Sequence, residues 1–264
     1  MPHRCWAQPQ NRSWVAKLKS CAPWASVELA SGGEPEYEAR MDAQQAKQLA
    51  AEAAVALLPT HGVIGLGSGS TAKLFIDVVG RLVREGRHLV GVPTSQDSRN
   101  QAAALGIPLL DDIGPWEIDV CVDGADEVSA DLDLIKGGGG CHAREKIVNF
   151  SAKKNVIVVD ESKLSRKLGR QWAVPVEVLP FGRNATARAL TQFGTVSLRE
   201  KGGGPWITDS GNYIYDVRTG ELDSPLALDA ALRQVPGVVE TGLFLGRADV
   251  VLVAGATGVQ SLTR

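Results

Sequence analysis

Two carboxylates three positions apart are the first residues in this sequence that suggest chemistry. Asp123 and Asp126 follow a short apolar run and flank the small residues Gly124 and Ala125. A turn with small central residues lets both carboxylates face one pocket and accept hydrogen bonds from several sugar hydroxyls. Crowded carboxylates repel, so one of them is expected to stay protonated near neutral pH. Taken alone, the segment is better explained as an Asp-rich turn whose side chains bond their own backbone.

A lysine followed by four glycines lies a short distance downstream. Lys136 precedes Gly137, Gly138, Gly139 and Gly140. Such a run costs backbone entropy and usually marks a place where the main chain approaches a ligand closely. Lys136 brings a cation to that place, so the segment indicates an anionic ligand.

Two further charged side chains are expected at the same edge of the fold. Glu145 lies in the first turn of a helix predicted from Ala143, where the helix dipole favours an ionised carboxylate. Lys163 follows the apolar run 156–159 and brings a second cation. Ligands of open α/β sheets bind outside the carboxyl ends of the strands, so both side chains are expected to reach one site. Glu145 alone could equally be an acid on a solvated helix face.

An earlier glycine-rich loop is predicted to hold a phosphate. A short strand at 63–66 runs into this loop, and an apolar helix follows it. Bare backbone amides and a helix N-terminus both favour an anion. The loop lacks the third glycine of a dinucleotide fingerprint and the lysine of a P-loop. By itself it could equally be a tight turn that caps a helix. Its residues are Gly67, Ser68, Gly69, Ser70 and Thr71.

Short apolar strands alternate with helical patterns in the first part of the chain. This alternation is typical of a mostly parallel sheet with helices on both faces, a Rossmann-like α/β fold. Ser95 is interpreted as a helix N-cap. Strands are predicted at 63–66, 88–92, 107–110, 118–122, 132–135 and 156–159, and helices at 43–58, 72–82, 99–105 and from 143.

The pattern changes after Gly169. The predicted order becomes βαββαβ, which is the ferredoxin-like arrangement of a smaller α/β domain. These elements are strands at 174–178, 195–198, 213–217 and 238–245 and helices at 185–193 and 226–235. A last strand at 248–254 is expected to return to the first sheet. The predicted domains are a Rossmann-like catalytic domain at 41–170, completed by 243–264, and a smaller domain at 171–242.

Residues 1–40 differ from the rest of the chain. They contain three of the six Trp and two of the four Cys, and they show no sustained hydrophobic period. Met41 is the only methionine after Met1, and a helical pattern begins just beyond it. We interpret this N-terminal extension as a start codon assigned too early, with a poorly ordered leader as the alternative.

Composition favours a small-molecule enzyme over a nucleic-acid or membrane protein. The formal net charge is only -2, with acids and bases interspersed, so electrostatics give no reason to expect nucleic acid or a membrane surface as a partner. No apolar run approaches the roughly 20 residues of a membrane span. Cys5, Cys21, Cys121 and Cys141 follow neither a disulfide nor a zinc spacing and suggest reduced thiols in the cytoplasm.

The ordered motifs together resemble the type A family of ribose-5-phosphate isomerases. Each motif alone is weak evidence, but the set occurs in the family's order and at similar spacing from about Met41 to the end, which is highly specific. The motifs are 65–71, 122–127, 135–139, 144–147 and 160–163, with the later segments 175–178, 236–239 and 242–244 also fitting.

The resemblance implies an aldose–ketose isomerase of the pentose phosphate pathway that interconverts ribose 5-phosphate and ribulose 5-phosphate. It implies no metal and no other cofactor, and assembly as a homodimer or homotetramer. Glu145 would move the proton between C1 and C2, with Asp123 and Lys136 as the other catalytic residues and Lys47 assisting at the phosphate. The substrate-binding residues would be Ser68, Gly69, Ser70, Thr71, Asp123, Gly124, Ala125, Asp126, Lys136, Gly137, Gly138, Gly139 and Lys163.

The chemistry of such an isomerase explains these residue types. An enediolate oxygen develops negative charge, and Lys136 with the glycine amides would stabilise it. The substrate is mostly a closed ring, and its opening moves a proton between two oxygens, which is a task for Asp123 or its neighbour.

The chain departs from the family pattern at Gly140-Cys141-His142-Ala143, where small or apolar residues are usual, and at Ser68, where Thr is common. Cys141 and His142 lack the partners of a zinc site, but His142 could tune Glu145 or crowd the pocket. Two alternatives remain open. One is a non-catalytic sugar-phosphate sensor, and the other is a related sugar-phosphate deaminase or coenzyme A transferase.

Overall fold

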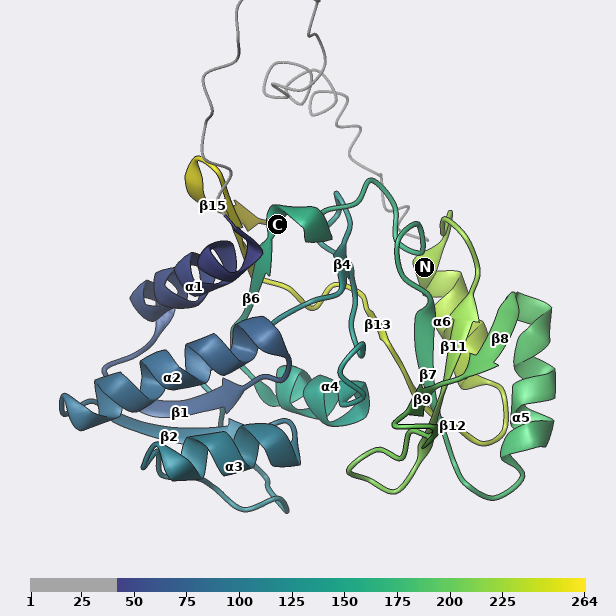
Figure 1. The fold of residues 1–264 in the computed structure, drawn as a ribbon, viewed down its shortest axis with the longest axis horizontal. Coiled ribbons are helices and arrows are strands. Elements are labelled where there is room, and N and C mark those ends of the chain that lie inside the picture. The colour runs from purple at the N-terminus through teal and green to yellow at the C-terminus, as the bar shows by residue number, and fades with distance from the viewer. Residues whose placement is uncertain (1–41) are drawn as a thin grey trace, which may run out of the picture. The chain divides into compact units, whose positions relative to one another are not determined.

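The computed structural model describes residues 42–264 (Figure 1). The interpretation of residues 1–40 therefore lies outside the described residues. The largest sheet has six strands, four from the first part of the chain and two from the C-terminal end. The strand order is β15-β14-β6-β3-β1-β2. All neighbours are parallel except β14 and β15. The strands are β1 (His61–Leu66), β2 (His88–Pro93), β3 (Val120–Asp123), β6 (Asn155–Asp160), β14 (Val250–Gly255) and β15 (Gly258–Thr263).

Helices pack on both faces of this sheet, which confirms the predicted fold class. The helices are α1 (Ala43–Ala53), continued by η1 (Ala54–Leu57), α2 (Ser70–Arg84), α3 (Gln96–Ala104) and α4 (His142–Ser151). Helices α1 and α2 share one core with the sheet. Val148 of α4 packs on Cys121 and Val92 on the other face. The turn before α3 supports the N-cap prediction, because the Ser95 side chain accepts a hydrogen bond from the backbone N–H of Ser98 at 3.1 Å.

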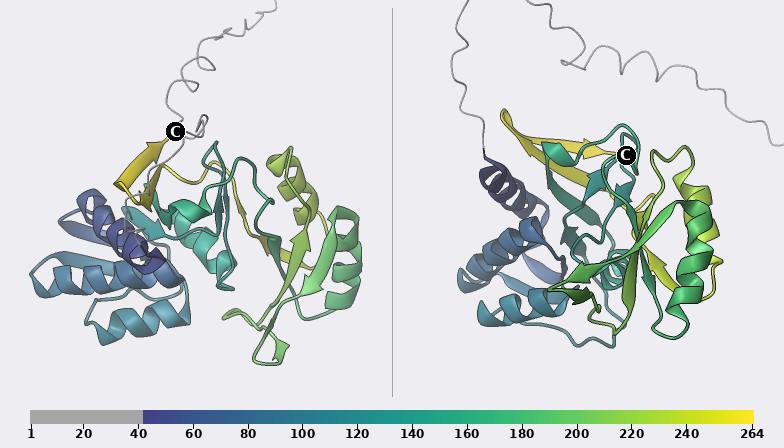
Figure 2. Two further views of the ribbon diagram at one scale, coloured as in Figure 1. Left: turned by 45° about the horizontal axis from the view of Figure 1, so that its top comes forward. Right: turned by 45° about the vertical axis from the view of Figure 1, so that its right-hand side comes forward.

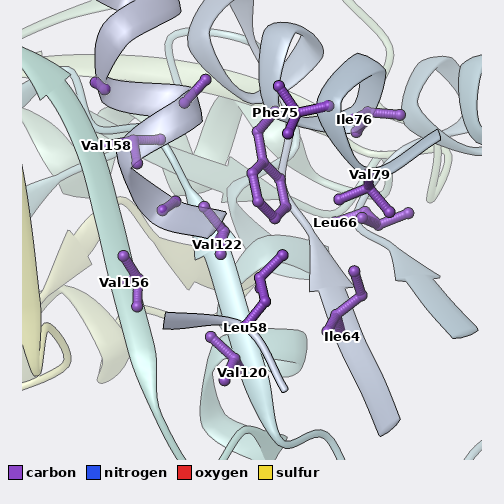
Figure 3. Close-up of a cluster of buried hydrophobic side chains, with 14 of the residues drawn as sticks. Leu58, Ile64, Leu66, Phe75, Ile76, Val79, Val120, Val122, Val156 and Val158 are labelled. Atoms are coloured by element: carbon purple, nitrogen blue, oxygen red, sulfur yellow. The ribbon is translucent and has the colours of Figure 1, made fainter. Parts of the chain in front are cut away.

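The spacing of apolar residues explains why α2 lies on the sheet. Phe75, Ile76 and Val79 recur at intervals of three and four positions, which places them on one face of a helix. They are fully buried against Leu66 and Val122 (Figure 3). Each buried side chain of this size contributes about 1.5–3 kcal/mol. This packing fixes the N-terminus of α2 at the carboxyl end of β1.

A four-stranded sheet of order β12-β7-β11-β8 forms the smaller lobe. Its elements follow the predicted βαββαβ order, and their separation from the six-stranded sheet is visible in two further views (Figure 2). They are β7 (Val174–Val178), α5 (Arg183–Leu190), η3 (Thr191–Phe193), β8 (Thr195–Leu198), β11 (Tyr213–Arg218), α6 (Pro225–Arg233) and β12 (Val238–Thr241). A short hairpin, β9 (Glu200–Lys201) with β10 (Gly204–Pro205), extends from this lobe.

The predicted strand at 238–245 is wrong as a single strand. It breaks at Gly242 into β12 and β13 (Leu243–Phe244), and β13 pairs with β5 (Leu134–Ile135) in a three-stranded sheet completed by β4 (Glu127–Val128). A Cβ atom at Gly242 would lie 2.3 Å from the carbonyl oxygen of Lys136 and 2.5 Å from Pro175. Only glycine allows the chain to pass between the two sheets at this point.

Two other predictions of strands need correction. Residues 107–110 form only one isolated bridge, between Gly91 and Leu109, because Pro108 has no N–H to donate to a ladder. The final strand is β14, and it continues into β15, which was not predicted. β15 is an edge strand that is mostly exposed, so its sequence lacks the apolar signal of a buried strand. Among residues 42–264, no helix is both long and apolar enough to cross a bilayer.

Candidate active site

The site lies where the strand order of the six-stranded sheet reverses. β1 pairs with β2 on one side and with β3 on the other, so the connections that leave β1 and β3 diverge. Ligands of doubly wound sheets bind in the crevice at such a point. The loops that follow β1 and β3 at this crevice are the predicted phosphate loop, 67–71, and the predicted sugar-binding turn, 123–126.

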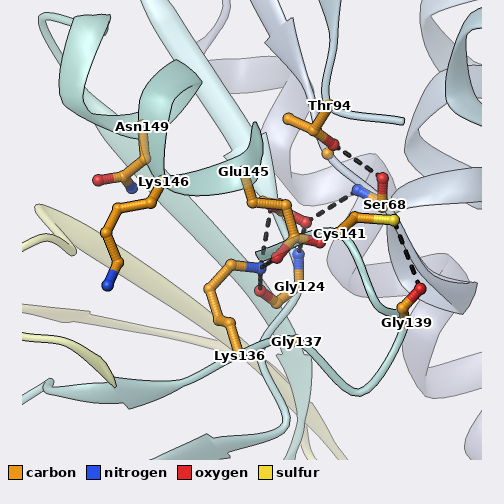
Figure 4. Close-up of polar contacts among 12 residues, drawn as sticks. Ser68, Thr94, Gly124, Lys136, Gly137, Gly139, Cys141, Glu145, Lys146 and Asn149 are labelled. Atoms are coloured by element: carbon orange, nitrogen blue, oxygen red, sulfur yellow. Dashed lines mark hydrogen bonds and ion pairs between the residues drawn. The ribbon is translucent and has the colours of Figure 1, made fainter. Parts of the chain in front are cut away.

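Lys136 lies at the centre of a buried polar cluster. Its Nζ is 2.9 Å from Asp123 Oδ2, 3.2 Å from Glu145 Oε2 and 2.6 Å from the carbonyl oxygen of Gly124 (Figure 4). The side chains of Lys136, Asp123 and Glu145 are at most 4 % exposed. The end of β3, which supplies Asp123 and Gly124, and the first turn of α4, which supplies Glu145, therefore hold this ammonium group in place.

Asp123 and Glu145 both lie beside the Lys136 ammonium group, and the pKa of each carboxyl group is raised. Burial raises the pKa of Glu145 to about 8, and the negative charge of Asp123 adds to the effect while Lys136 opposes it. Burial likewise raises the pKa of Asp123. Burial would lower the pKa of Lys136, but the two carboxylates outweigh it and raise that pKa. The raised pKa values of Asp123 and Glu145 thus arise mainly from desolvation, and not from the predicted repulsion between Asp123 and Asp126.

One buried oxygen of Glu145 lies beside the Lys136 ammonium group but accepts no hydrogen bond from the described residues. The 3.2 Å contact between Oε2 and Lys136 lies outside hydrogen-bond geometry, and no group in the described part of the chain donates a hydrogen bond to that oxygen. Asp123 differs in this respect. Its Oδ1 accepts from the backbone N–H groups of Ser68 at 3.1 Å and Gly124 at 2.7 Å, while its Oδ2 contacts Lys136.

Helix geometry separates the three adjacent charged residues of α4. Successive residues are about 100° apart around a helix, so Glu145 points toward Lys136 while Lys146 points away (Figure 4). The Nζ of Lys146 donates to the carbonyl oxygen of Thr241 at 2.6 Å and contacts Glu240 Oε1 at 2.8 Å. Arg144 donates to the carbonyl oxygen of Asp209 at 3.0 Å. Both neighbours tie α4 to the smaller lobe and leave Glu145 in the site.

The loop after β1 ends in a helix N-terminus that no side chain caps. Gly69 is the N-cap of α2 and has no side chain to bond the first amides of the helix. These N–H groups, from Ser70 and the following residues, are free to bind an anion. Ser68 is used differently: its hydroxyl contacts Thr94 Oγ1 at 2.8 Å and Ser95 Oγ at 2.7 Å. These contacts of Ser68 fix the loop to the segment that follows β2.

A pocket of about 100 Å³ unites nearly all the predicted residues. It is lined by Ser68, Gly69, Ser70, Thr71, Gly124, Ala125, Asp126, Lys136, Gly137, Gly138, Gly139, Glu145 and Lys163, together with Lys47 and Val159. Asp123 is the one predicted site residue that does not line it. A wider chamber of about 590 Å³ adjoins the pocket and shares Ser68, Gly69, Ser70 and Gly139 with it.

Two further lysines line the same pocket as Ser70 and Thr71 at the start of α2. Lys47 comes from α1 and Lys163 from η2 (Glu161–Lys163). Neither forms an ion pair with a carboxylate of the described residues, although Lys163 lies 5.3 Å from the centre of the Trp172 ring. Unpaired cations beside free helix amides make this part of the pocket suited to a phosphate group.

The segment that departs from the family pattern has a structural explanation. Gly140 has φ +77°, and a Cβ atom there would lie 2.8 Å from the Trp206 ring. His142 is fully buried behind Gly137, with Nε2 3.3 Å from the carbonyl oxygen of Glu240. Burial lowers the pKa of His142 to about 3, so it is a neutral packing residue outside the pocket lining. Burial also raises the pKa of the Cys141 thiol to about 12.

Several residues at the site were missed from sequence. Val159 closes one wall of the pocket, and Trp206, Ile207 and Asp209 line the adjoining chamber from the smaller lobe. Val159 belongs to an apolar strand and carries no chemical signal. The other three lie in a loop whose sequence resembles any exposed turn, and tertiary contacts reveal their position: Asp209 accepts hydrogen bonds from the backbone N–H of Gln96 at 2.7 Å and from Arg144 at 3.0 Å.

Comparisons with known proteins identify the family of this chain. A family model described as ribose 5-phosphate isomerase A (phosphoriboisomerase A) matches residues 90–258. The chain is 46% identical over 225 residues to ribose-5-phosphate isomerase A of Gloeobacter violaceus, covering 84% of this chain and 98% of that protein.

Solved structures give the same result. Ribose 5-phosphate isomerase A of Methanocaldococcus jannaschii superposes with a TM-score of 0.80 at 42% identity, covering 84% of this chain and 100% of the other. A D-ribose-5-phosphate isomerase in complex with phospho-erythronic acid gives a TM-score of 0.82 at 39% identity, covering 85% and 100%. The chain therefore belongs to the ribose-5-phosphate isomerase A family.

Proposed function

We propose that Glu145 carries the proton in the reaction of this enzyme, the interconversion of D-ribose 5-phosphate and D-ribulose 5-phosphate. The reaction takes a proton from a carbon beside a carbonyl group and returns it to the neighbouring carbon. One carboxylate can do both steps if it stays near both carbons. Glu145 is supported in this role by its place in the pocket lining beside Lys136 and by a pKa that burial raises to about 8, because a base is most effective when its pKa is near the working pH.

Lys136 and the glycine loop would stabilise the enediolate. Negative charge develops on the substrate oxygens, and preorganised donors are most effective in a site shielded from water. The ammonium group of Lys136 is already in place, held by Asp123 and the carbonyl oxygen of Gly124. Gly139 is exposed beside it, with open space where a Cβ atom would lie. Its N–H is our candidate for a second donor.

Asp126 is better placed than Asp123 to open the sugar ring. Asp126 lines the pocket and uses Oδ2 to accept from the N–H of Gly138 at 2.6 Å, whereas both oxygens of Asp123 are occupied. We expect Asp126→Asn to slow the cyclic substrate far more than an analogue that cannot cyclise, because only the former needs proton transfer between ring oxygen and hydroxyl. Rates for both substrates test this, and equal slowing would rule it out.

The phosphate would occupy the end of the pocket formed by the α2 N-terminus, Lys47 and Lys163. It lies away from the reacting carbons, so its binding free energy orients the sugar without taking part in bond changes.

Assembly as a homodimer or homotetramer and a cytoplasmic location complete the proposal. The family resemblance supports the first, and the scattered cysteines support the second.

The observation that carries the function is the convergence of Glu145, Lys136 and the uncapped helix α2 on one pocket. The test is incubation of the purified chain with ribose 5-phosphate in the presence of a metal chelator, with detection of the ketose. Formation of ribulose 5-phosphate is expected. Binding without turnover would instead favour the sugar-phosphate sensor, and no binding would refute the assignment.

A further inference from the structure

The glycine loop that follows Lys136 is held from behind by an arginine of the smaller lobe. Arg199 follows β8, and its side chain is 11% exposed. Its Nε donates to Asp216 Oδ2 at 2.9 Å, and its Nη2 pairs with the other oxygen of the same carboxylate. Its Nη1 donates to the carbonyl oxygen of Gly137 and, at 3.3 Å, to that of Gly138. One guanidinium group thus links Asp216 on β11 to two successive peptide groups of the loop.

These contacts determine which way the amides of the loop point. A trans peptide group directs its C=O and N–H in opposite directions. The peptide between Gly137 and Gly138 is held at both ends, since Arg199 binds its oxygen and Asp126 Oδ2 accepts from its N–H at 2.6 Å. The next peptide directs its oxygen toward Arg199 as well. Its N–H, that of Gly139, therefore points to the opposite side, which is the pocket that Gly139 lines.

The N–H of Gly139 has no acceptor in the described part of the protein, so a substrate oxygen can use it. Trp206 holds the far end of the loop, because its ring lies against Gly140 and its backbone N–H donates to the carbonyl oxygen of Arg199 at 2.9 Å. The loop is glycine-rich and has no side chains of its own to fix its conformation. Its order must come from these partners.

We propose that Arg199, braced by Asp216, is a positioning residue that aims the Gly139 N–H at the developing enediolate oxygen. The inference rests on the proposed function. Lysine cannot replace arginine here, because a single ammonium group lacks the planar fork that binds one carboxylate and two carbonyl oxygens together. Arg199 itself does not line the pocket next to Glu145, so its effect passes through the loop.

The test compares Arg199→Ala and Arg199→Lys with Arg233→Ala. Arg233 is a matched control, since it pairs with Asp229 and Glu240 in the same lobe without touching the loop. Displacing a catalytic group by about 1 Å can cost about 10²-fold in rate, so both Arg199 variants are expected to lose kcat on that scale with a much smaller change in KM. Arg233→Ala should keep its kcat. Added guanidinium at millimolar concentration should restore part of the rate of Arg199→Ala only.

Binding of phospho-erythronic acid gives a second readout. Its carboxylate carries negative charge as the enediolate does, so its affinity should fall in both Arg199 variants along with kcat. Circular dichroism checks the folding of each variant. Asp216→Asn keeps Arg199 but weakens the ion pair that holds its guanidinium group, so it should show a smaller loss of kcat. A folded Arg199→Ala enzyme with wild-type kcat, or a loss confined to KM, overturns the role of Arg199. Failure of the wild-type chain to isomerise ribose 5-phosphate would instead remove the proposed function.

Discussion

The lysines that we assign to the phosphate and the lysine beside Glu145 differ in burial and in pairing. At the phosphate end, Lys47 and Lys163 are only partly buried, no carboxylate of the described residues pairs with them, and the first amides of α2 are free. At the reacting end, Lys136 is 3% exposed and lies between two carboxylates. Water screens the first set of charges and is excluded from the second.

This difference separates binding from reactivity. Charges that stay close to water can attract a phosphate group, which is the anchoring role that we propose for Lys47 and Lys163. Charges removed from water must adjust, and the pKa of Glu145 rises to about 8 as a result. The proposed base thus obtains a pKa near the pH of the cell from burial together with a neighbouring acid.

The largest expected effect comes from removing the base at the reacting end. Glu145→Gln keeps the size of the side chain but cannot accept a proton, so kcat should fall by about 10²- to 10⁴-fold. In the wild-type enzyme, kcat/KM should rise with pH and level off above about 8, since the ionised form of Glu145 is the base. Steady-state kinetics measure both quantities. The exposed Glu85→Gln is the control, and near-normal turnover in Glu145→Gln would exclude this residue from the mechanism.

A smaller effect of a different kind is expected at the phosphate end. Lys163→Ala removes a charge-assisted contact, worth about 1.5–3 kcal/mol. That corresponds to roughly a 10- to 10²-fold weaker affinity. Because the phosphate does not react, the loss should appear in KM while kcat changes little. If kcat falls and KM stays constant, the division of the pocket into an anchor and a reacting end is wrong.

The smallest effect concerns stability and has a definite sign. The pKa of Glu145 is raised from 4.5 to about 8, so the folded state holds a proton that the unfolded state releases between these values. The free energy of unfolding therefore falls as pH rises through this window. A glutamine side chain does not titrate, so Glu145→Gln should gain in Tm over the wild type by a few degrees between about pH 5 and pH 8.

Thermal unfolding of both proteins across this pH range measures the gain. Lys163→Ala provides the comparison, since its difference from the wild type should not follow the same pH dependence. If the difference in Tm between Glu145→Gln and the wild type does not change with pH, the pKa of Glu145 is not raised in the folded protein.

The sequence predicts the site well wherever chemistry coincides with a strand end. Asp126, Lys136 and Lys163 follow short apolar runs, and parallel pairing brings the carboxyl ends of such strands to one edge. Fold class follows from the same alternation of strands and helices. These features are local, so the pattern of apolar and charged residues is enough to locate them.

What the sequence does not predict depends on contacts between distant segments. Asp123 is held by a hydrogen bond from the backbone N–H of Ser68, which is 55 positions away in the sequence. Arg199 and Trp206 of the smaller lobe contact the glycine loop at Gly137 and Gly140. Neither Arg199 nor Trp206 differs locally from an ordinary surface residue. The break at Gly242 was missed because apolar residues lie on both sides of it, and only the close approach of Lys136 and Pro175 shows that one strand ends there and another begins.

The crossing at Gly242 also bears on how the protein is made. The backbone N–H of Lys136 donates to the carbonyl oxygen of Gly242 at 2.9 Å, and β5 pairs with β13 directly beyond it. The side-chain partners of Lys136 are made with it, but the backbone partner Gly242 and strand β13 are made about a hundred residues later. A nascent chain that has not yet reached Phe244 therefore lacks the backbone pairing that holds the segment carrying Lys136. Catalytic competence should therefore appear abruptly, late in synthesis.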